Sequence, residues 1–101
     1  MNDLKTNERY AIVHILYLIM NADGIIHPKE EEYMNKAYVE LGININDIEG
    51  IAIMNDIQAE NIIRNMSSSQ KEYAQSLFIS MAESDGYVHP QEAAIIEQLF
   101  K

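Results

Sequence analysis

Apolar residues recur along most of this chain at the spacing of an α-helix. Residues 28–41 show it most clearly, because their apolar side chains form one stripe along a helix: Tyr33, Met34, Ala37, Tyr38 and Leu41. Residues 10–20 are apolar nearly all round, which is typical of a central helix surrounded by others. No interval alternates apolar and polar residues as a half-buried strand does. The pattern predicts an all-α fold.

Glycine and proline indicate where these helices begin and end. The chain has four Gly and two Pro; Pro28 and Pro90 suit the first position of a helix, and Gly42 suits a left-handed helix stop. Residues 69–72, Ser-Gln-Lys-Glu, have the spacing of a capping box. We expect one compact domain, residues 1–101, with about six helices: residues 3–21, 28–41, 47–54, 57–65, 69–84 and 90–101. The last helix is expected to bury Ala93, Ile96, Leu99 and Phe100.

A stretch of eight residues occurs twice. Residues 23–30 read Asp-Gly-Ile-Ile-His-Pro-Lys-Glu, and residues 85–92 read Asp-Gly-Tyr-Val-His-Pro-Gln-Glu. The Asp, Gly, His, Pro and Glu are identical, and each copy lies between two apolar helical segments, which indicates an internal duplication. We expect residues 10–41 and 72–101 to be equivalent, superposable helix–loop–helix hairpins. The isoleucine-rich segment 43–66, with its two short helices, separates them.

Each repeated residue suits a connection between two helices. Gly24 and Gly86 are expected at positive φ, where a Cβ is strained. The Asp of each copy can accept a backbone hydrogen bond in an Asx-turn, while His, Pro and Glu fall at the N-cap, first and third positions of the next helix. Ile26 and Val88 are expected to anchor the loops in the core. On this interpretation the loops are connectors that bind nothing.

The same residues also match half of a calcium-binding EF-hand loop. With Asp at position 5 of that loop, Gly falls at 6, the aliphatic residue at 8 and Glu at 12. Position 1 is then Ile19 or Met81, which cannot ligate, so a complete EF-hand is excluded. Two half-loops brought together would offer four carboxylates to a divalent cation: Asp23, Glu30, Asp85 and Glu92. Oxygen ligands favour Ca²⁺ or Mg²⁺ over Zn²⁺, and both interpretations of the loops stay open.

The histidines are weaker candidates for metal binding. His27 and His89 precede Glu30 and Glu92 by three residues, a spacing that suits a transition metal but that helix capping explains equally simply. His14 lies inside an apolar helix, where a core histidine with satisfied hydrogen bonds is the favoured interpretation.

Composition narrows the function further. The chain carries 16 acidic and 7 basic residues, a net charge of −9, which argues against a nucleic-acid partner. It has no Cys, so disulfides and Cys-based catalysis or metal sites are excluded. No nucleophile or phosphate-binding motif is recognisable, and we expect no enzyme. Residues 10–20 are too short to span a bilayer, which takes about 20 residues; we expect a cytoplasmic protein without direct membrane insertion.

The Ala-Asp-Gly run at residues 22–24 with Glu30, echoed by residues 84–92, resembles the TerB-like family, and the resemblance covers nearly the whole chain. That family is named for bacterial tellurite resistance, and a related domain occurs in a membrane-anchored DnaJ-like co-chaperone. The resemblance implies a compact all-helical domain, divalent-cation binding through Asp23, Glu30, Asp85 and Glu92, and a role in stress-linked, membrane-associated assemblies. We therefore expect a non-enzymatic module that docks on other proteins. The alternative is a purely structural interaction domain without a metal site.

Overall fold

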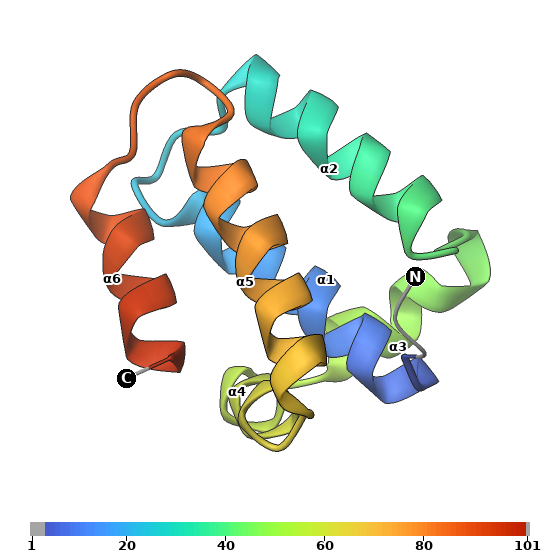
Figure 1. Cartoon of the computed structure of the whole chain (residues 1–101). Helices are drawn as coiled ribbons and strands as arrows, with labels where there is room; N and C mark the ends of the chain where they lie inside the picture. Colours follow the sequence, from blue (N-terminus) through green and yellow to red (C-terminus); the bar gives the residue numbers. More distant parts are fainter. Residues whose placement is uncertain (1–3, 101) are drawn as a thin grey trace.

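The computed structural model describes residues 4–100, and these residues form α-helices, one short 3-10 helix and connecting loops, with no strand (Figure 1). The order is α1 (Thr6–Asn21), α2 (Pro28–Glu40), η1 (Ile45–Asp47), α3 (Ile48–Ile53), α4 (Asp56–Arg64), α5 (Ser68–Glu83) and α6 (Pro90–Leu99). The all-α prediction is confirmed. Residues 1–3 and 101 of the predicted domain lie outside the described residues, and so do residue 3 as the predicted start of the first helix and residue 101 as the predicted end of the last.

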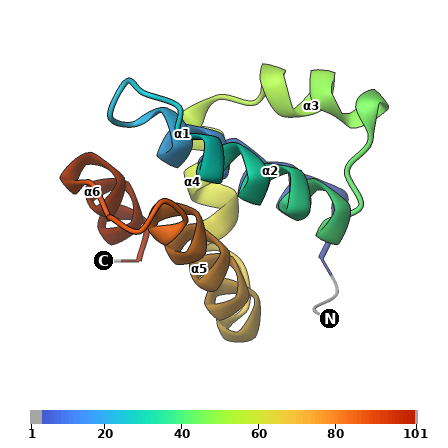
Figure 2. The same ribbon diagram turned by 90° about the horizontal axis from the view of Figure 1, so that it is seen from above.

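Helix α1 is the centre of the molecule, as its apolar sequence predicts. It contacts α2, α3, α4, α5 and α6, and Figure 2 shows α3 and α6 on opposite sides of the molecule. Seven of its residues are buried: Ala11, Ile12, Val13, Ile15, Leu16, Ile19 and Met20. The radius of gyration of 12.4 Å matches the roughly 13 Å expected of a single globular domain of this length.

The ends of the helices follow the local signals in the sequence, with one correction. Pro28 and Pro90 begin α2 and α6, and Gly42 takes the left-handed conformation after α2, with φ of 67°. The capping box predicted at residues 69–72 is wrong, because the N-cap of α5 is Ser67. Its Oγ accepts a hydrogen bond from the N–H of Gln70, whose Oε1 accepts one from the N–H of Ser67. Three serines in succession offered the same cap chemistry in more than one register.

The buried face of α6 differs from the prediction at one position. Leu99 is buried, and Ile96 and Phe100 pack against the core as expected, but Ala93 is exposed. The first turn of α6 instead buries Glu92. Hydropathy patterns assign carboxylates to the solvent-facing side of a helix. The predicted buried face of α6 was therefore rotated slightly relative to the observed one.

Among residues 4–100, no helix combines the length and the apolar character that crossing a membrane requires.

Candidate functional site

The two copies of the repeated loop fold in the same way. Gly24 and Gly86 adopt φ of 79° and 87°. Asp23 Oδ1 accepts a hydrogen bond from the N–H of Ile25 at 3.0 Å, and Asp85 Oδ1 accepts one from the N–H of Tyr87 at 3.1 Å. The predicted positive φ and Asx-turns are therefore confirmed in both copies.

Each loop leads into its helix through a buried glutamate. His27 and His89 are the N-caps of α2 and α6. The N–H of His27 donates to Glu30 Oε1 at 3.4 Å, and the N–H of His89 donates to Glu92 Oε1 at 3.2 Å. The glutamates thus accept the hydrogen bond from the N-cap N–H that a capping box requires, as predicted. Neither imidazole makes a side-chain cap hydrogen bond.

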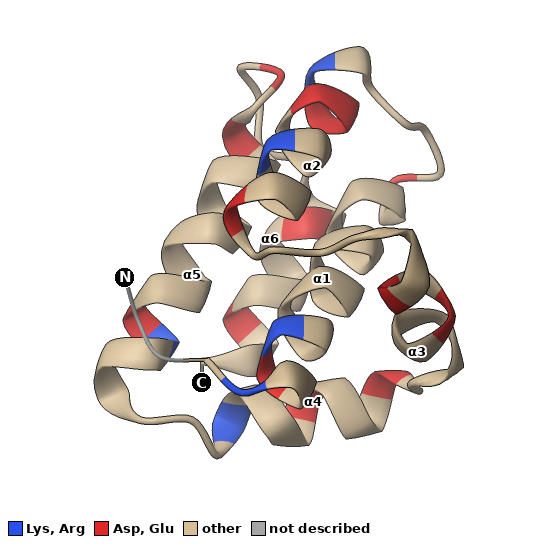
Figure 3. Ribbon diagram, turned by 90° about the vertical axis from the view of Figure 1, so that its right-hand side faces the viewer, with Lys and Arg blue, Asp and Glu red and all other residues tan. Residues whose placement is uncertain are grey.

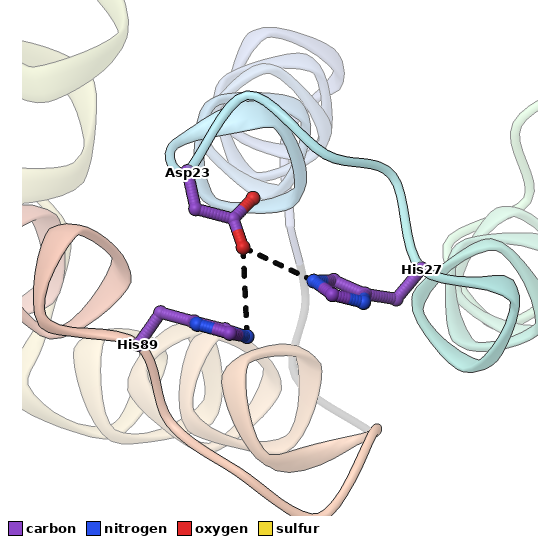
Figure 4. A group of neighbouring side chains, drawn as sticks. All are labelled: Asp23, His27 and His89. Atoms are coloured by element: carbon purple, nitrogen blue, oxygen red, sulfur yellow. Dashed lines mark hydrogen bonds and ion pairs between the residues drawn. The ribbon is translucent and has the colours of Figure 1, made fainter.

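The imidazoles are turned toward the opposite hairpin instead. The rings of His27 and His89 stack on each other, with centroids 5.0 Å apart and an angle of 13° between their planes. Residues 62 positions apart in the sequence are thereby brought into direct contact between the α1–α2 and α5–α6 loops (Figure 4). The two half-loops do face each other, which the sequence alone did not determine.

Each aspartate contacts both imidazoles. Asp23 Oδ2 lies 3.0 Å from His27 Nε2 and 3.5 Å from His89 Nε2, the two contacts drawn in Figure 4. Asp85 Oδ2 lies 3.3 Å from His89 Nε2 and 3.5 Å from His27 Nδ1. The four side chains form a crossed network, which we call the Asp–His cluster (Asp23, His27, Asp85, His89).

This network favours the charged forms of Asp23, His27 and Asp85. The hydrogen bond with Asp23 raises the pKa of His27 above its ordinary value, with the charges of Asp85 and Glu30 adding to it. The hydrogen bond with His27, followed by that from the N–H of Ile25, lowers the pKa of Asp23. Burial opposes ionisation of Asp85, but its donors, the N–H of Tyr87 and the imidazole of His89, outweigh burial and lower its pKa.

In the first turns of α2 and α6, two carboxyl groups are fully buried. Glu30 and Glu92 each have 0% exposed surface, and as carboxylates their Oε2 atoms have no hydrogen-bond donor in the described part of the chain. Burial, and then the proximity of Glu92, raise the pKa of Glu30 to about 8. Two like charges in a buried site disfavour each other, so a shared proton or a cation stabilises the pair.

Three residues of the cluster have ligand atoms that are close enough to hold one ion. Single ligand atoms of Asp23, His27 and His89 all lie within 4.8 Å of one another. Of the four predicted ligands, Asp23 and Asp85 belong to the Asp–His cluster, and Glu30 and Glu92 are buried at the starts of the helices that follow. The sequence interpretation treated His27 and His89 as helix caps, whereas their rings contact each other and both aspartates. The signal was present, because an Asp–His pair at i, i+4 occurs in both copies.

The aliphatic residues of the loops do not anchor them, contrary to the prediction. Ile26 is 48% exposed and Val88 is 38% exposed. The polar residues hold the loops together instead, helped in the second copy by Tyr87, whose ring meets His89 edge-on at 4.7 Å.

The third histidine is satisfied, as predicted. His14 is half-buried, its Nε2 lies 2.8 Å from Asp56 Oδ1, and its Nδ1 lies 3.3 Å from the carbonyl oxygen of Ile51.

Comparisons of the chain with models of known protein families, with curated proteins and with solved structures find no match. The TerB-like resemblance rests on the repeated loop residues themselves.

Proposed function

We propose that this chain is a non-enzymatic, TerB-like interaction module that binds one divalent cation between its two repeated loops. The observation that carries the proposal is the convergence of the loops, which gathers Asp23, His27 and His89 around one point. When both are ionised, the fully buried carboxylates of Glu30 and Glu92 also favour a positive charge nearby.

The donor set alters the preference among cations. Four carboxylates favour Ca²⁺ or Mg²⁺, but imidazole nitrogens suit Zn²⁺ and other transition metals better. His27 and His89 supply such nitrogens, and Asp23 and Asp85 supply carboxylates that each contact both rings. We therefore place Zn²⁺ or a similar ion ahead of Ca²⁺ and Mg²⁺. A cation bridging the hairpins would couple their relative position to the availability of the metal.

The second candidate is a purely structural module, and the same geometry supports it. The Asp–His contacts already tie the α1–α2 loop to the α5–α6 loop without any ion. A protonated imidazole would supply the positive charge that the carboxylates need. On this view the surfaces of the domain, and not the loops, carry its function in a stress-linked assembly of proteins.

Calorimetric titration of the chelator-treated chain with Zn²⁺, Mn²⁺, Ca²⁺ and Mg²⁺ separates the two candidates. A cation site gives saturable heat and raises the melting temperature with ion concentration. The variant His27→Gln and the double variant Asp23→Asn with Asp85→Asn should lose the heat while they keep wild-type helicity. His14→Gln is the matched control, because His14 bonds to Asp56 and lies outside the cluster. No heat at millimolar ion, or equal loss in the His14 variant, leaves only the structural candidate.

A further inference from the structure

A hollow of about 290 Å³ lies between α1 and α3, away from the repeated loops. One turn of each helix lines it: His14, Tyr17 and Leu18 from α1, and Ile48, Ile51 and Ala52 from α3. On both helices these residues stand at i, i+3 and i+4, so two helix faces form its walls. The volume is slightly below the roughly 300–1,000 Å³ of small-molecule pockets, and it suits one or two inserted side chains.

A second hollow shares Leu18 with the first. It has a volume of about 410 Å³ and is also lined by Ile15 and Ile95, together with the acidic Asp56 and Glu60. We call the two hollows together the α1–α3 groove. Its apolar walls lead to the carboxylates of Asp56 and Glu60, and no described Lys or Arg lines it.

The surroundings of the groove are strongly acidic. Residues 43–63, which include α3 and most of α4, contain four Asp and Glu and no Lys or Arg. In Figure 3 the ribbon of α3 and the beginning of α4 accordingly carry red segments and no blue ones. The same stretch exposes large apolar side chains, each more than a third accessible: Ile45, Ile48, Ile53 and Ile57.

These features select one kind of occupant. A second copy of this chain also carries −9, so two copies would repel each other across the acidic rim, and an anionic membrane surface would be repelled in the same way. A wall of two helices with apolar positions at i, i+3 and i+4 receives an amphipathic helix. We infer that the α1–α3 groove docks a basic amphipathic helix of a partner protein, with its apolar side chains in the groove and its Lys or Arg near Asp56, Glu60 and Glu49.

This inference names the partner class of the proposed interaction module, but it does not depend on a bound cation. The groove residues and the Asp–His cluster have no member in common. Binding of the helix can therefore be measured on chelator-treated protein. His27→Gln should leave it unchanged even where that variant abolishes cation binding.

The probe is a synthetic helix of leucine and lysine with leucine at i, i+3, i+4 and i+7, titrated into the chain by calorimetry or fluorescence anisotropy. A companion peptide keeps every lysine and replaces leucine by glutamine, and a third replaces lysine by glutamate. We expect saturable one-to-one binding of the first peptide only, gain of peptide helicity by circular dichroism, and weaker binding at higher salt. Equal binding of the glutamine companion would show attraction by bulk charge and would overturn the inference, as would no binding at all.

A matched pair of variants tests the position of the contact. Ala52 lines the groove on α3, and Ala93 is an exposed alanine on α6 that lines a separate hollow beside α5. Both Ala52→Arg and Ala93→Arg add one positive charge, but only Ala52→Arg places a long side chain in the groove. We expect a loss of affinity of roughly tenfold or more for Ala52→Arg and less than about twofold for Ala93→Arg. Equal losses would overturn the inference.

A second pair guards against a folding defect in the arginine variant. Glu49→Gln removes a charge from α3, and Glu72→Gln removes one from an exposed position on α5. Melting temperatures of all four variants are recorded first, and affinities are compared only among folded chains. The Glu49 variant should reduce both the affinity and its salt dependence more than the Glu72 variant does. The reverse order would contradict docking at this groove.

Discussion

The two repeated loops differ at three positions out of eight, and at these positions only the backbone, not the side chain, takes part in the hydrogen bonds of the loops. When residues 23–30 are aligned with residues 85–92, the differing positions pair Ile25 with Tyr87, Ile26 with Val88 and Lys29 with Gln91 in the alignment. All six of these side chains are exposed. The five shared residues adopt positive φ, accept or donate loop hydrogen bonds, or begin the next helix.

The conformation of the loops is therefore fixed by polar and backbone requirements and not by apolar packing. Ile26 and Val88, the residues chosen from hydropathy as anchors, are free to differ because each lies partly in solvent. The Asp, His and Glu of each copy cannot differ independently, because each of them contacts its own loop or the opposite one. Changing equivalent residues in the two copies measures how equivalent the loops are.

The largest effect is expected from the buried glutamates. The pKa of Glu30 is raised to about 8, so the folded state keeps a proton that the unfolded chain releases near its ordinary value. Stability from this proton is fully present below about pH 4.5 and is lost as the pH rises through about 8, by a few kcal/mol at most. His27, whose pKa is also raised, acts in the same direction.

Glu30→Gln should therefore flatten the fall in stability between pH 5 and 8, because glutamine stays neutral and can donate to Glu92. Urea unfolding at a series of pH values, with chelator present, measures it. The wild-type chain serves as the control, and an unchanged fall in Glu30→Gln would show that no proton is held at this position.

The next effect tests the backbone of the two loops. An added Cβ at Gly24 or Gly86 would meet no atom within 4 Å, so the whole cost of an alanine comes from positive φ. Gly24→Ala and Gly86→Ala should each destabilise by about 1–2 kcal/mol, which lowers the melting temperature by roughly 5–10 °C. Gly24→Asn is the control, because Asn tolerates this conformation better. Clearly unequal losses would mean that the loops differ in ways that their dihedral angles hide.

A smaller effect distinguishes the two aspartates. The pKa of His27 is raised chiefly by its hydrogen bond to Asp23, and Asp85 adds only its charge. Asp23→Asn should consequently lower the titration midpoint of His27 more than Asp85→Asn does, with the midpoint followed by the NMR shift of the ring protons. A greater change in the Asp85 variant would reverse the assignment of hydrogen-bonded partners within the cluster.

Sequence reasoning succeeded where the signal is local. Positive φ at Gly24, the Asx-turn at Asp23 and the start of α2 at Pro28 each depend on a few neighbouring residues. The stacked imidazoles depend on how two hairpins 62 residues apart pack together, and no periodicity contains that information. The burial of Glu30 was not predicted either, because a carboxylate in the first turn of a helix is usually solvated. Superposition of residues 10–41 on 72–101 stays a prediction.

The smallest expected effect concerns the one ring that the two loops do not share. Tyr87 meets His89 edge-on, whereas the equivalent Ile25 offers no ring to His27. Tyr87→Ile should cost about 0.5 kcal/mol, the lower end for an aromatic pair, because Tyr87 is 60% exposed. Ile25→Tyr should stabilise the chain by a similar amount, because the new tyrosine ring can contact His27. The double variant Ile25→Tyr with Tyr87→Ile should therefore unfold at nearly the wild-type urea midpoint. If Ile25→Tyr instead destabilises the chain and the double exchange adds both losses, the backbones of the two loops match but their surroundings do not.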